Sequence, residues 1–396
     1  MSTQICTKNL VFVISCFIFF SAQVLWGQSP ANERFSEYVP KLKNKKVGLV
    51  VNHTSVIGSS HLADTLLSMG VQVTRLFAPE HGFRGDHSAG ATVSSSVDAK
   101  TGLPIVSLYG KNKKPAPSDL AGLDWVVFDI QDVGVRFYTY ISTMHWVMEA
   151  CAESSIPFMI LDRPNPNGHY VDGPILEPGF ESFIGMHPIP IVHGLTVGEL
   201  ALMINGEGWL KGGIQCKLEI VLADNYAHSD YYALTKAPSP NLPNMRSVLM
   251  YPGMCLFEGT KVSLGRGTDW PFQVFGFPGW HSAPFEFTPK VIPGVADNPP
   301  HKYTQCQGFN LNMVDPNKLF LKRRMELDWL LIAYKNYPNP NQFFTPFFDK
   351  LAGNSTLRKQ IESGFSATQI RNSWTQGLQA YQEMRKKYLL YPLWRE

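Results

Sequence analysis

Apolar residues in the first half of the chain fall into short runs that alternate with amphipathic stretches. Such runs, rich in Val, Ile and Phe, are typical of buried strands, and the stretches between them have helical periodicity. Helices are expected over 61–70 and 137–154. The runs predict five strands, at 47–52, 71–80, 104–110, 124–132 and 156–164. The resulting order β, α, β, β, β, α, β indicates an α/β protein with a Rossmann-like, mostly parallel sheet and helices on both faces.

The pattern becomes less regular after the fifth strand. A stretch rich in Pro and Gly covers residues 163–190. Thr196 and Glu199 then have the spacing of a capping box, which predicts a helix beginning near Val197. A further strand is expected over 217–223.

Long loops dominate from about Tyr226 onward, with two more helices expected over 317–337 and 366–388. At 396 residues the chain exceeds the usual size of a single core. We therefore expect three parts: a signal peptide at 1–27, a Rossmann-like catalytic domain at 28–225, and a smaller α+β domain at 226–396 that completes a cleft.

The first 27 residues have the features of a secretory signal peptide. Lys8 precedes an apolar run from Leu10 to Phe20 that is short for a membrane span, and cleavage is expected after Gly27. The protein is therefore expected to be exported to the periplasm, without stable membrane insertion once the signal is removed. Cys16 leaves a lipoprotein as one alternative, and secretion is another.

Four cysteines follow the expected cleavage point: Cys151, Cys216, Cys255 and Cys306. In an oxidising compartment they could form up to two disulfides in three connectivities, or stay buried as free thiols.

Charge and missing motifs exclude several classes of partner. Removing residues 1–27 takes away Lys8 and lowers the net charge from +3 to +2, and the basic clusters are short and scattered, so no nucleic-acid partner is expected. There is no GxGxxG, GxxxxGK[ST] or GxSxG motif, and no HExxH around the histidines. We therefore expect neither a cofactor nor a metal, although a site built from four histidines was considered: His53, His81, His87 and His193.

Reactive side chains gather where the predicted strands end. The carboxyl ends of parallel strands meet at one edge of a sheet, where ligands bind, so these residues are expected to share one cleft. They are Asn52, His53, Glu80, His81, Asp129, Gln131, Asp132, Asp162 and Arg163.

Two places stand out among these strand ends. Glu80 lies between Pro79 and His81 and has no evident part in a helix or turn, which favours a functional role. The segment 129–140, DIQDVGVRFYTY, mixes acids, an amide, an arginine and tyrosines, which suits a polyhydroxylated ligand. The alternative is an internal Asp132–Arg136 bridge with the tyrosines packed in the core.

Eight sequence blocks together resemble one family, and the resemblance covers nearly all of the chain after residue 27. The blocks are APEHGFRG, DIQDVGVRFYTY, LDRPNPNG, VDGPILEP, HGLTVGELA, PSPNLPN, YPGMCLFEGTKVSLGRGT and KYLLYP. They are similar to the NamZ-type exo-β-N-acetylmuramidases, glycoside hydrolase family 171. The resemblance implies release of N-acetylmuramic acid from the non-reducing end of peptidoglycan fragments in cell-wall turnover, at a cleft between a Rossmann-like domain and a smaller one.

The resemblance also implies roles for particular residues. Glu80 matches the catalytic glutamate of the family. Where an arginine often precedes HG[LM]T in the family, Val192 precedes His193 here, which puts a substrate contact near His193 in doubt. The other residues implied to surround the cleft are Asn52, His81, Asp129, Gln131, Arg136, Tyr138, Asp162, Glu258, Arg266 and Thr268.

Glycoside hydrolysis needs an acid and a second group that stabilises or attacks the anomeric carbon. We expect Glu80 to be the acid, and Asp129, Asp132 or the acetamido group of the sugar to be its partner. The lactyl carboxylate of N-acetylmuramic acid calls for a guanidinium, for which Arg266 is the first candidate and Arg136 the second. Aromatic walls could come from Tyr138, Trp270 and Phe272.

Two other classes of function stay open on the sequence. One is an exported binding protein for cell-wall sugars without catalysis, and the other is an esterase or amidase that acts on wall components.

Overall fold

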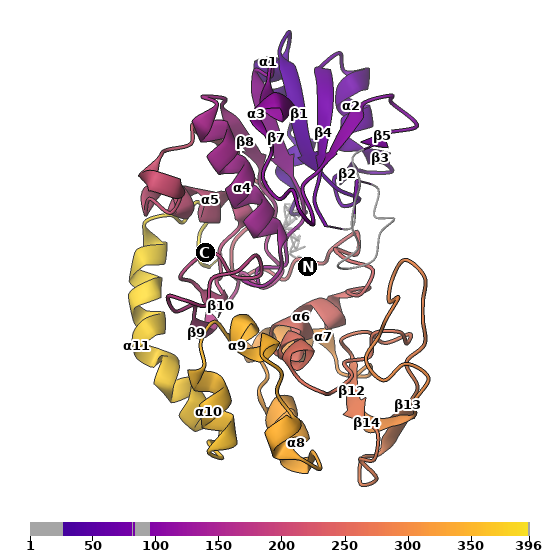
Figure 1. Cartoon of the computed structure of the whole chain (residues 1–396). Coiled ribbons are helices and arrows are strands. Elements are labelled where there is room, and N and C mark those ends of the chain that lie inside the picture. Colours follow the sequence, from indigo (N-terminus) through magenta and orange to yellow (C-terminus); the bar gives the residue numbers. More distant parts are fainter. Residues whose placement is uncertain (1–26, 81, 84–95, 395–396) are drawn as a thin grey trace, which may run out of the picture.

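The computed structural model describes residues 27–80, 82–83 and 96–394. Its centre is a seven-stranded sheet in the order β11-β8-β7-β1-β4-β6-β5, in which only β5 is antiparallel to its neighbour (Figure 1). The strands are β1 (Lys46–Val51), β4 (Gln72–Ala78), β5 (Ser96–Val97), β6 (Pro104–Ser107), β7 (Trp125–Asp129), β8 (Phe158–Leu161) and β11 (Leu218–Val221).

The six parallel strands have the topology of a doubly wound Rossmann sheet. Counted along the chain they run 6-5-4-1-2-3 across the sheet, so the direction of winding reverses between β1 and β7. This confirms the predicted Rossmann-like, mostly parallel sheet. Ligands of such folds bind beyond the carboxyl ends of the strands, close to this reversal point.

Alternating residues of each strand pack against helices on opposite faces. On β1, Leu49 and Val51 join the cluster that contains residues of α1 and α2, whereas Val50 joins the cluster that contains residues of α4 and α5. Burying each such side chain stabilises the fold by about 1.5–3 kcal/mol. The helices are α1 (Phe35–Leu42), α2 (Leu62–Ser68), α3 (Pro117–Leu120), α4 (Tyr140–Glu153) and α5 (Val197–Gly206).

The starts of α5 and α4 can be compared with the starts predicted from the sequence. The side chain of Thr196 accepts a hydrogen bond from the backbone N–H of Glu199, and the Glu199 side chain accepts one from the N–H of Thr196, so the predicted capping box starts α5. Helix α4 begins at Tyr140, three residues later than predicted, because residues 137–139 belong to the loop after β7.

The second half combines short helices with small antiparallel sheets. Strand β14 lies between β12 and β13, and β9 pairs with β10. The strands of these small sheets are β9 (Asp172–Ile175), β10 (Pro190–Val192), β12 (Val274–Phe277), β13 (Phe285–Phe287) and β14 (Cys306–Asn310). One more antiparallel pair, β2 (Val56–Ile57) and β3 (Ser60–His61), lies between β1 and α2 near the start of the chain. The helices are α6 (Met245–Met254), α7 (Pro316–Lys322), α8 (Asp328–Asn336), α9 (Phe347–Ala352), α10 (Thr356–Glu362) and α11 (Ala367–Lys386). Short 3-10 helices cover η1 (Ala31–Glu33), η2 (Lys211–Gly213), η3 (Cys255–Gly259) and η4 (Pro340–Gln342).

One helix prediction in this half was wrong. A single helix was expected over 317–337, but Arg323 has the left-handed conformation, with φ of 49°, and ends α7 before α8 begins. A left-handed residue closes a helix by turning the chain away from its axis. The helix expected over 366–388 is present as α11, which begins with a capping box between Ser366 and Gln369.

The end of the chain returns to the Rossmann sheet (Figure 1). After α11, the hydroxyl of Tyr391 donates to Asp162 Oδ2 at 2.7 Å and accepts from the backbone N–H of Ala223 at 2.9 Å. One hydrophobic cluster contains both Val50 of the sheet and Ile370 of α11. The two parts of the chain therefore share a core, and the division at residue 225 stays a prediction.

Cys151, Cys216, Cys255 and Cys306 are all buried free thiols, so of the two alternatives the structure has the unpaired one. The predicted signal peptide lies outside the described residues, except Gly27. Among the described residues, no helix has both the length and the apolar character needed to span a bilayer.

Candidate active site

A cavity of about 580 Å³ lies between the carboxyl edge of the sheet and the second half of the chain. Its lining comes from the segments after β4 and β6, the loop before α4, residues 183–184, and loop and helix residues beyond residue 238. Its described lining residues are Glu80, Tyr109, Phe137, Tyr138, Thr139, Tyr140, Phe183, Ile184, Ser239, Asn241, Leu242, Tyr251, Glu258, Arg266, Phe272, Val295, Ala296, Asp297, Asn298, Pro299 and Phe347.

Glu80 stands on the cavity wall, two residues beyond the end of β4. It is half-buried, and its Oε2 accepts a hydrogen bond from Thr139 Oγ1 at 2.7 Å. The hydroxyl of Tyr109 is a second partner, and burial together with the charge of Glu80 raises the pKa of Tyr109. Because Thr139 directly precedes α4, the Glu80 side chain lies beside the N-terminus of that helix.

Arg266 stands on the same cavity, within the GRGT loop. Its Nε donates to Glu258 Oε1 at 2.9 Å, its Nη2 donates to the same oxygen, and its guanidinium lies 5.0 Å from the ring centre of Phe272. Burial alone would lower the pKa of Arg266, but the Glu258 carboxylate raises it above the ordinary value. Arg266 is the one basic side chain among the described residues that line the cavity.

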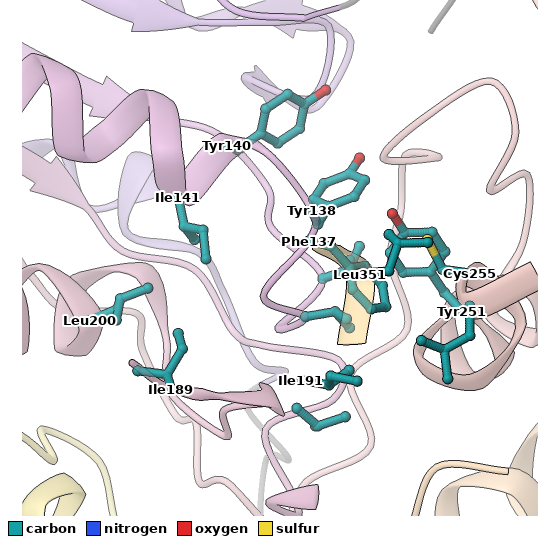
Figure 2. Packing of buried hydrophobic residues seen from close by; sticks show 14 of the residues in the cluster. Phe137, Tyr138, Tyr140, Ile141, Ile189, Ile191, Leu200, Tyr251, Cys255 and Leu351 are labelled. Atoms are coloured by element: carbon teal, nitrogen blue, oxygen red, sulfur yellow. The ribbon is translucent and has the colours of Figure 1, made fainter. Parts of the chain in front are cut away.

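Aromatic rings form a continuous part of the wall. The rings of Tyr138 and Tyr140 are 4.9 Å apart, Tyr138 and Tyr251 are 5.8 Å apart, and Tyr251 and Phe272 are 5.1 Å apart, all edge to face. Figure 2 shows the hydroxyls of Tyr138 and Tyr140 pointing to the same side. The Tyr138 hydroxyl donates to the carbonyl of Pro238 at 2.6 Å, which fixes the ring.

Asp132 lies behind this aromatic wall and does not line the cavity. Its Oδ2 accepts from the backbone N–H of Gly134 at 2.6 Å, while its Oδ1 is buried without a hydrogen-bond partner among the described residues. Burial raises the pKa of Asp132 to about 7. The carboxyl is close enough to influence the pKa of both Tyr138 and Tyr140.

Asp129, expected as a catalytic group, is not among the residues that line the cavity. The side chain is fully buried, with Oδ1 2.6 Å from Arg163 Nε, Oδ2 3.0 Å from Arg163 Nη2, and Asn32 Nδ2 bonded to Oδ2 at 3.1 Å. Both oxygens are thus taken by partners within the fold. Arg163, expected at the substrate, is the other half of this buried ion pair.

Arg136, expected to contact substrate, does not line the cavity either, and its partners are backbone carbonyls instead of Asp132. Its fully buried guanidinium donates to four backbone carbonyls, and burial lowers its pKa to about 9. Those carbonyls belong to Pro174, Ile189, Leu351 and Ala352, at 2.8–2.9 Å. Arg136 therefore fastens the ends of β9 and α9 to the loop before α4.

Asp162 and His193 lie in the fold instead of on the cavity wall. Asp162 accepts from Thr196 Oγ1 at 2.6 Å and from the hydroxyl of Tyr391, and burial raises its pKa to about 6. His193 Nδ1 accepts from the N–H of Leu195 at 3.2 Å, and burial lowers its pKa to about 3. Both residues hold loops at the sheet edge, and neither lines the cavity.

Three further predicted contacts are also absent from the cavity lining. Gln131 Nε2 donates to the carbonyls of Asp132 and Pro164. Asn52 Oδ1 accepts from the N–H and the hydroxyl of Thr54. Thr268 lines a neighbouring recess instead. His81 and His87 lie outside the described residues.

Of the predicted site residues, the structure brings Glu80, Tyr138, Glu258 and Arg266 together on one cavity, with Phe272 as a predicted aromatic wall. The sequence reasoning missed Tyr109, which lies near the end of the strand predicted at 104–110 and two residues beyond the observed end of β6, so the strand-end rule could have found it. Asn241 and Asp297 lie in loops without periodicity, where no such rule applies.

The described residues hold no group of three His, Cys, Asp or Glu side chains arranged for a metal ion. What the cavity offers is carboxylates beside aromatic rings and a single guanidinium. Carboxylates act on glycosidic bonds, and aromatic walls with a few polar groups hold small ligands in such cavities. Together, the Rossmann sheet and this cavity define the class of an α/β glycoside hydrolase.

Comparisons with known proteins give the family. Two family models match the chain: the N-terminal region of exo-β-N-acetylmuramidase NamZ at residues 47–246, and the C-terminal region of the same family at 249–391. The chain belongs to the NamZ family of exo-β-N-acetylmuramidases.

Individual relatives agree with this membership. The peptidoglycan β-N-acetylmuramidase NamZ of Bacillus subtilis is 43% identical over 373 residues, which cover 90% of this chain and 89% of that protein. A crystal structure of a DUF1343 family protein from Bacteroides fragilis has a TM-score of 0.87 at 46% identity, covering 92% of this chain and 99% of that one. A second DUF1343 protein from the same organism has a TM-score of 0.78 at 30% identity, with the same coverage.

Proposed function

We propose that this protein is an exo-acting β-N-acetylmuramidase that removes N-acetylmuramic acid from the non-reducing end of peptidoglycan fragments. Family membership supports a glycosidase of the cell wall. The single observation that carries the finer proposal is that Glu80 and Arg266 line one cavity. A proton donor for the bond and a cation for the lactyl carboxylate are thus available to one sugar.

Glu80 acts as the general acid. Its carboxyl group is half-buried, and it is held by the hydroxyls of Thr139 and Tyr109, so its position relative to a bound sugar is fixed. In the first step it gives its proton to the glycosidic oxygen as the bond to the leaving sugar breaks.

The acetamido group of the substrate supplies the second catalytic function. Asp129 is bound inside the fold, and Asp132 lies behind Tyr138 and Tyr140, so neither carboxylate lines the cavity. The acetamido oxygen attacks the anomeric carbon while Glu80 protonates the leaving group, and water then opens the resulting ring. Substrate-assisted routes of this type are an established variant of glycoside hydrolysis.

Arg266 selects the muramic acid. Its bonds to Glu258 come from Nε and Nη2, which leaves Nη1 to meet the lactyl carboxylate. The bonds to Glu258 and the contact with Phe272 restrict the rotation of the guanidinium before substrate arrives. N-acetylglucosamine has no carboxylate and gains nothing from this contact.

The place of action proposed is the periplasm, after cleavage of the signal peptide behind Gly27. The support is the cation and apolar run at the start of the sequence, together with a substrate that is part of the cell wall.

The test is hydrolysis of a chromogenic N-acetylmuramide beside the matching N-acetylglucosaminide, by the mature protein and by Glu80→Gln. Release of chromophore from the muramide alone, and only by the wild type, is the expected result. Tight binding of the muramide without release would mean a sugar-binding protein. Activity confined to esters or amides of wall components would mean a different hydrolase.

A further inference from the structure

A second recess of about 480 Å³ adjoins the cavity. The same two chain segments line both hollows. In the first, Arg266 lines the cavity, while Gly267 and Thr268 line the recess. In the other, residues 295–299 line the cavity and residues 290–292 line the recess. The two hollows therefore lie next to each other along these segments.

The recess carries aromatic rings and polar groups side by side. Trp270 and Phe285 are both half-buried, with ring centres 5.8 Å apart in an edge-to-face arrangement. Thr268 is half-buried, and Asp269, Glu286 and Lys290 are exposed around them. An aromatic ring packs against the apolar face of a pyranose, while the surrounding polar groups bond to its hydroxyl and amide groups.

The recess is rigid where it meets the cavity. The carbonyl of Gly267 accepts from the N–H of Lys290 at 2.8 Å, and Thr268 Oγ1 donates to the carbonyl of Gly265 while accepting from the N–H of Trp270. Gly267 has a positive φ of 80°, and a Cβ there would lie 2.3 Å from the Lys290 carbonyl. This wall is thus formed before any ligand binds, which lowers the entropic cost of binding.

The charges of the recess select a neutral ligand. Its side chains comprise two carboxylates, on Asp269 and Glu286, and one ammonium, on Lys290. Their net charge of −1 disfavours a phosphate or a carboxylate, including the lactyl group of muramic acid. Among the sugars of a peptidoglycan strand, the neutral one is N-acetylglucosamine.

We propose that the second recess binds an N-acetylglucosamine unit of the glycan strand whose terminal muramic acid occupies the cavity. This inference rests on the proposed exo-muramidase function. The recess holds the part of the strand that remains after the terminal sugar is released, so its contribution depends on strand length.

Trp270→Ala tests the proposal by kinetics, with Trp329→Ala as the matched control. Trp329 is a half-buried tryptophan on α8 that lines neither hollow. On glycan fragments of four or more sugars, Trp270→Ala should raise KM by about five- to tenfold with kcat unchanged, the effect of one lost aromatic contact. KM for the single-sugar chromogenic muramide should stay the same, and Trp270→Phe should restore most of the affinity for fragments.

An unchanged KM on long fragments, or an equal rise on fragments and on the single-sugar muramide, would overturn the proposal. Thermal unfolding of each variant shows whether Trp270→Ala is folded, and Lys290→Ala at the rim gives the same test without removing a packed ring. Its expected effect is a rise in KM of about threefold on the long fragments alone.

Binding of a tetramer of N-acetylglucosamine, measured by calorimetry on the full chain, separates this proposal from the proposed function. One possible result is that the wild type hydrolyses neither chromogenic sugar but binds the tetramer, and that Trp270→Ala weakens this binding. That result would support sugar binding in the recess and refute the muramidase proposal. If the muramide is hydrolysed but no tetramer binding is measurable at millimolar concentration, only the recess proposal falls.

Discussion

Acidic side chains stand at the carboxyl ends of β4, β7 and β8 on one edge of the sheet, yet their surroundings differ. Asp129 at the end of β7 and Asp162 just after β8 are fully buried and bonded to Arg163, Thr196 and other groups of the fold. Beyond β4, Glu80 is half-buried and lines the cavity. The end of a parallel strand therefore brings a carboxylate to the edge, but the loops packed over that edge decide whether the group meets a ligand or holds the fold together.

The largest effect should come from removing the acid on the open side. Glu80→Gln keeps the shape of the side chain but cannot give up a proton, so kcat on the muramide should fall by about 10³- to 10⁴-fold while the free energy of unfolding stays the same. Glu177→Gln, an exposed glutamate away from the cavity, is the control. A Glu80→Gln enzyme with more than a tenth of wild-type kcat would remove Glu80 from the mechanism.

On the closed side, the same kind of substitution should affect stability. Asp129→Ala leaves the buried Arg163 guanidinium without its partner, which should lower the free energy of unfolding by about 3–5 kcal/mol. Denaturant unfolding measures this, and Asp224→Ala, an exposed carboxylate beyond the end of β11, should change it by less than about 0.5 kcal/mol. A stable but inactive Asp129→Ala would place Asp129 back in catalysis.

Arg266 extends the comparison from acidic to basic side chains. Arg266→Ala should raise KM for the muramide by about 100-fold, the equivalent of a lost charged hydrogen bond, with little effect on any residual glucosaminide activity. Arg266→Lys keeps the charge but not the planar guanidinium, so its KM for the muramide should lie between those of the wild type and of Arg266→Ala. Equal losses on both sugars would refute the contact with the lactyl carboxylate.

The burial of Asp132 should make the free energy of unfolding depend on pH. Burial raises its pKa from 3.8 to about 7, so the folded protein holds this proton more tightly than the unfolded chain does. The resulting stabilisation is complete below about pH 4 and is lost as the pH rises through 7. Asp132→Asn cannot ionise, and its free energy of unfolding should fall by about 4 kcal/mol less than that of the wild type between pH 4 and pH 8. If denaturant unfolding shows that the two proteins lose the same free energy of unfolding between pH 4 and pH 8, the prediction is contradicted.

The smallest effect concerns the hydroxyl that holds Glu80. Thr139→Val removes the 2.7 Å hydrogen bond to Glu80 Oε2 without changing the shape of the side chain, and kcat should fall about fivefold while KM changes little. Thr143→Val, a buried threonine one turn further along α4, should leave kcat as it is. The same fall in both variants would show damage to the helix instead.

The sheet could be predicted because its strands record their burial in their own residues. Val50 and Leu49 pack on opposite faces, and such apolar runs identify a strand buried on both sides. The break between α7 and α8 could not be predicted, because it depends on a left-handed Arg323, a residue type that normally continues a helix.

For the cavity, the sequence pointed to the correct edge but not to the correct members. Strand ends located Glu80, and the resemblance of the GRGT loop located Arg266. Whether Arg136 or Asp129 faces a ligand depends on partners such as Leu351 and Asn32, which are distant in sequence and come close only in the folded chain. No local pattern carries that information.

The bond between Tyr391 and Asp162 has a consequence for the order in which the molecule is assembled. Asp162 directly follows strand β8, but one of the hydroxyls that bonds to this aspartate belongs to Tyr391, which is synthesised 229 residues later. The edge of the sheet at Asp162 therefore lacks one of its hydrogen bonds until Tyr391 has been synthesised. A ribosome-stalled chain that ends before Tyr391 would consequently be a more protease-sensitive species than the complete one.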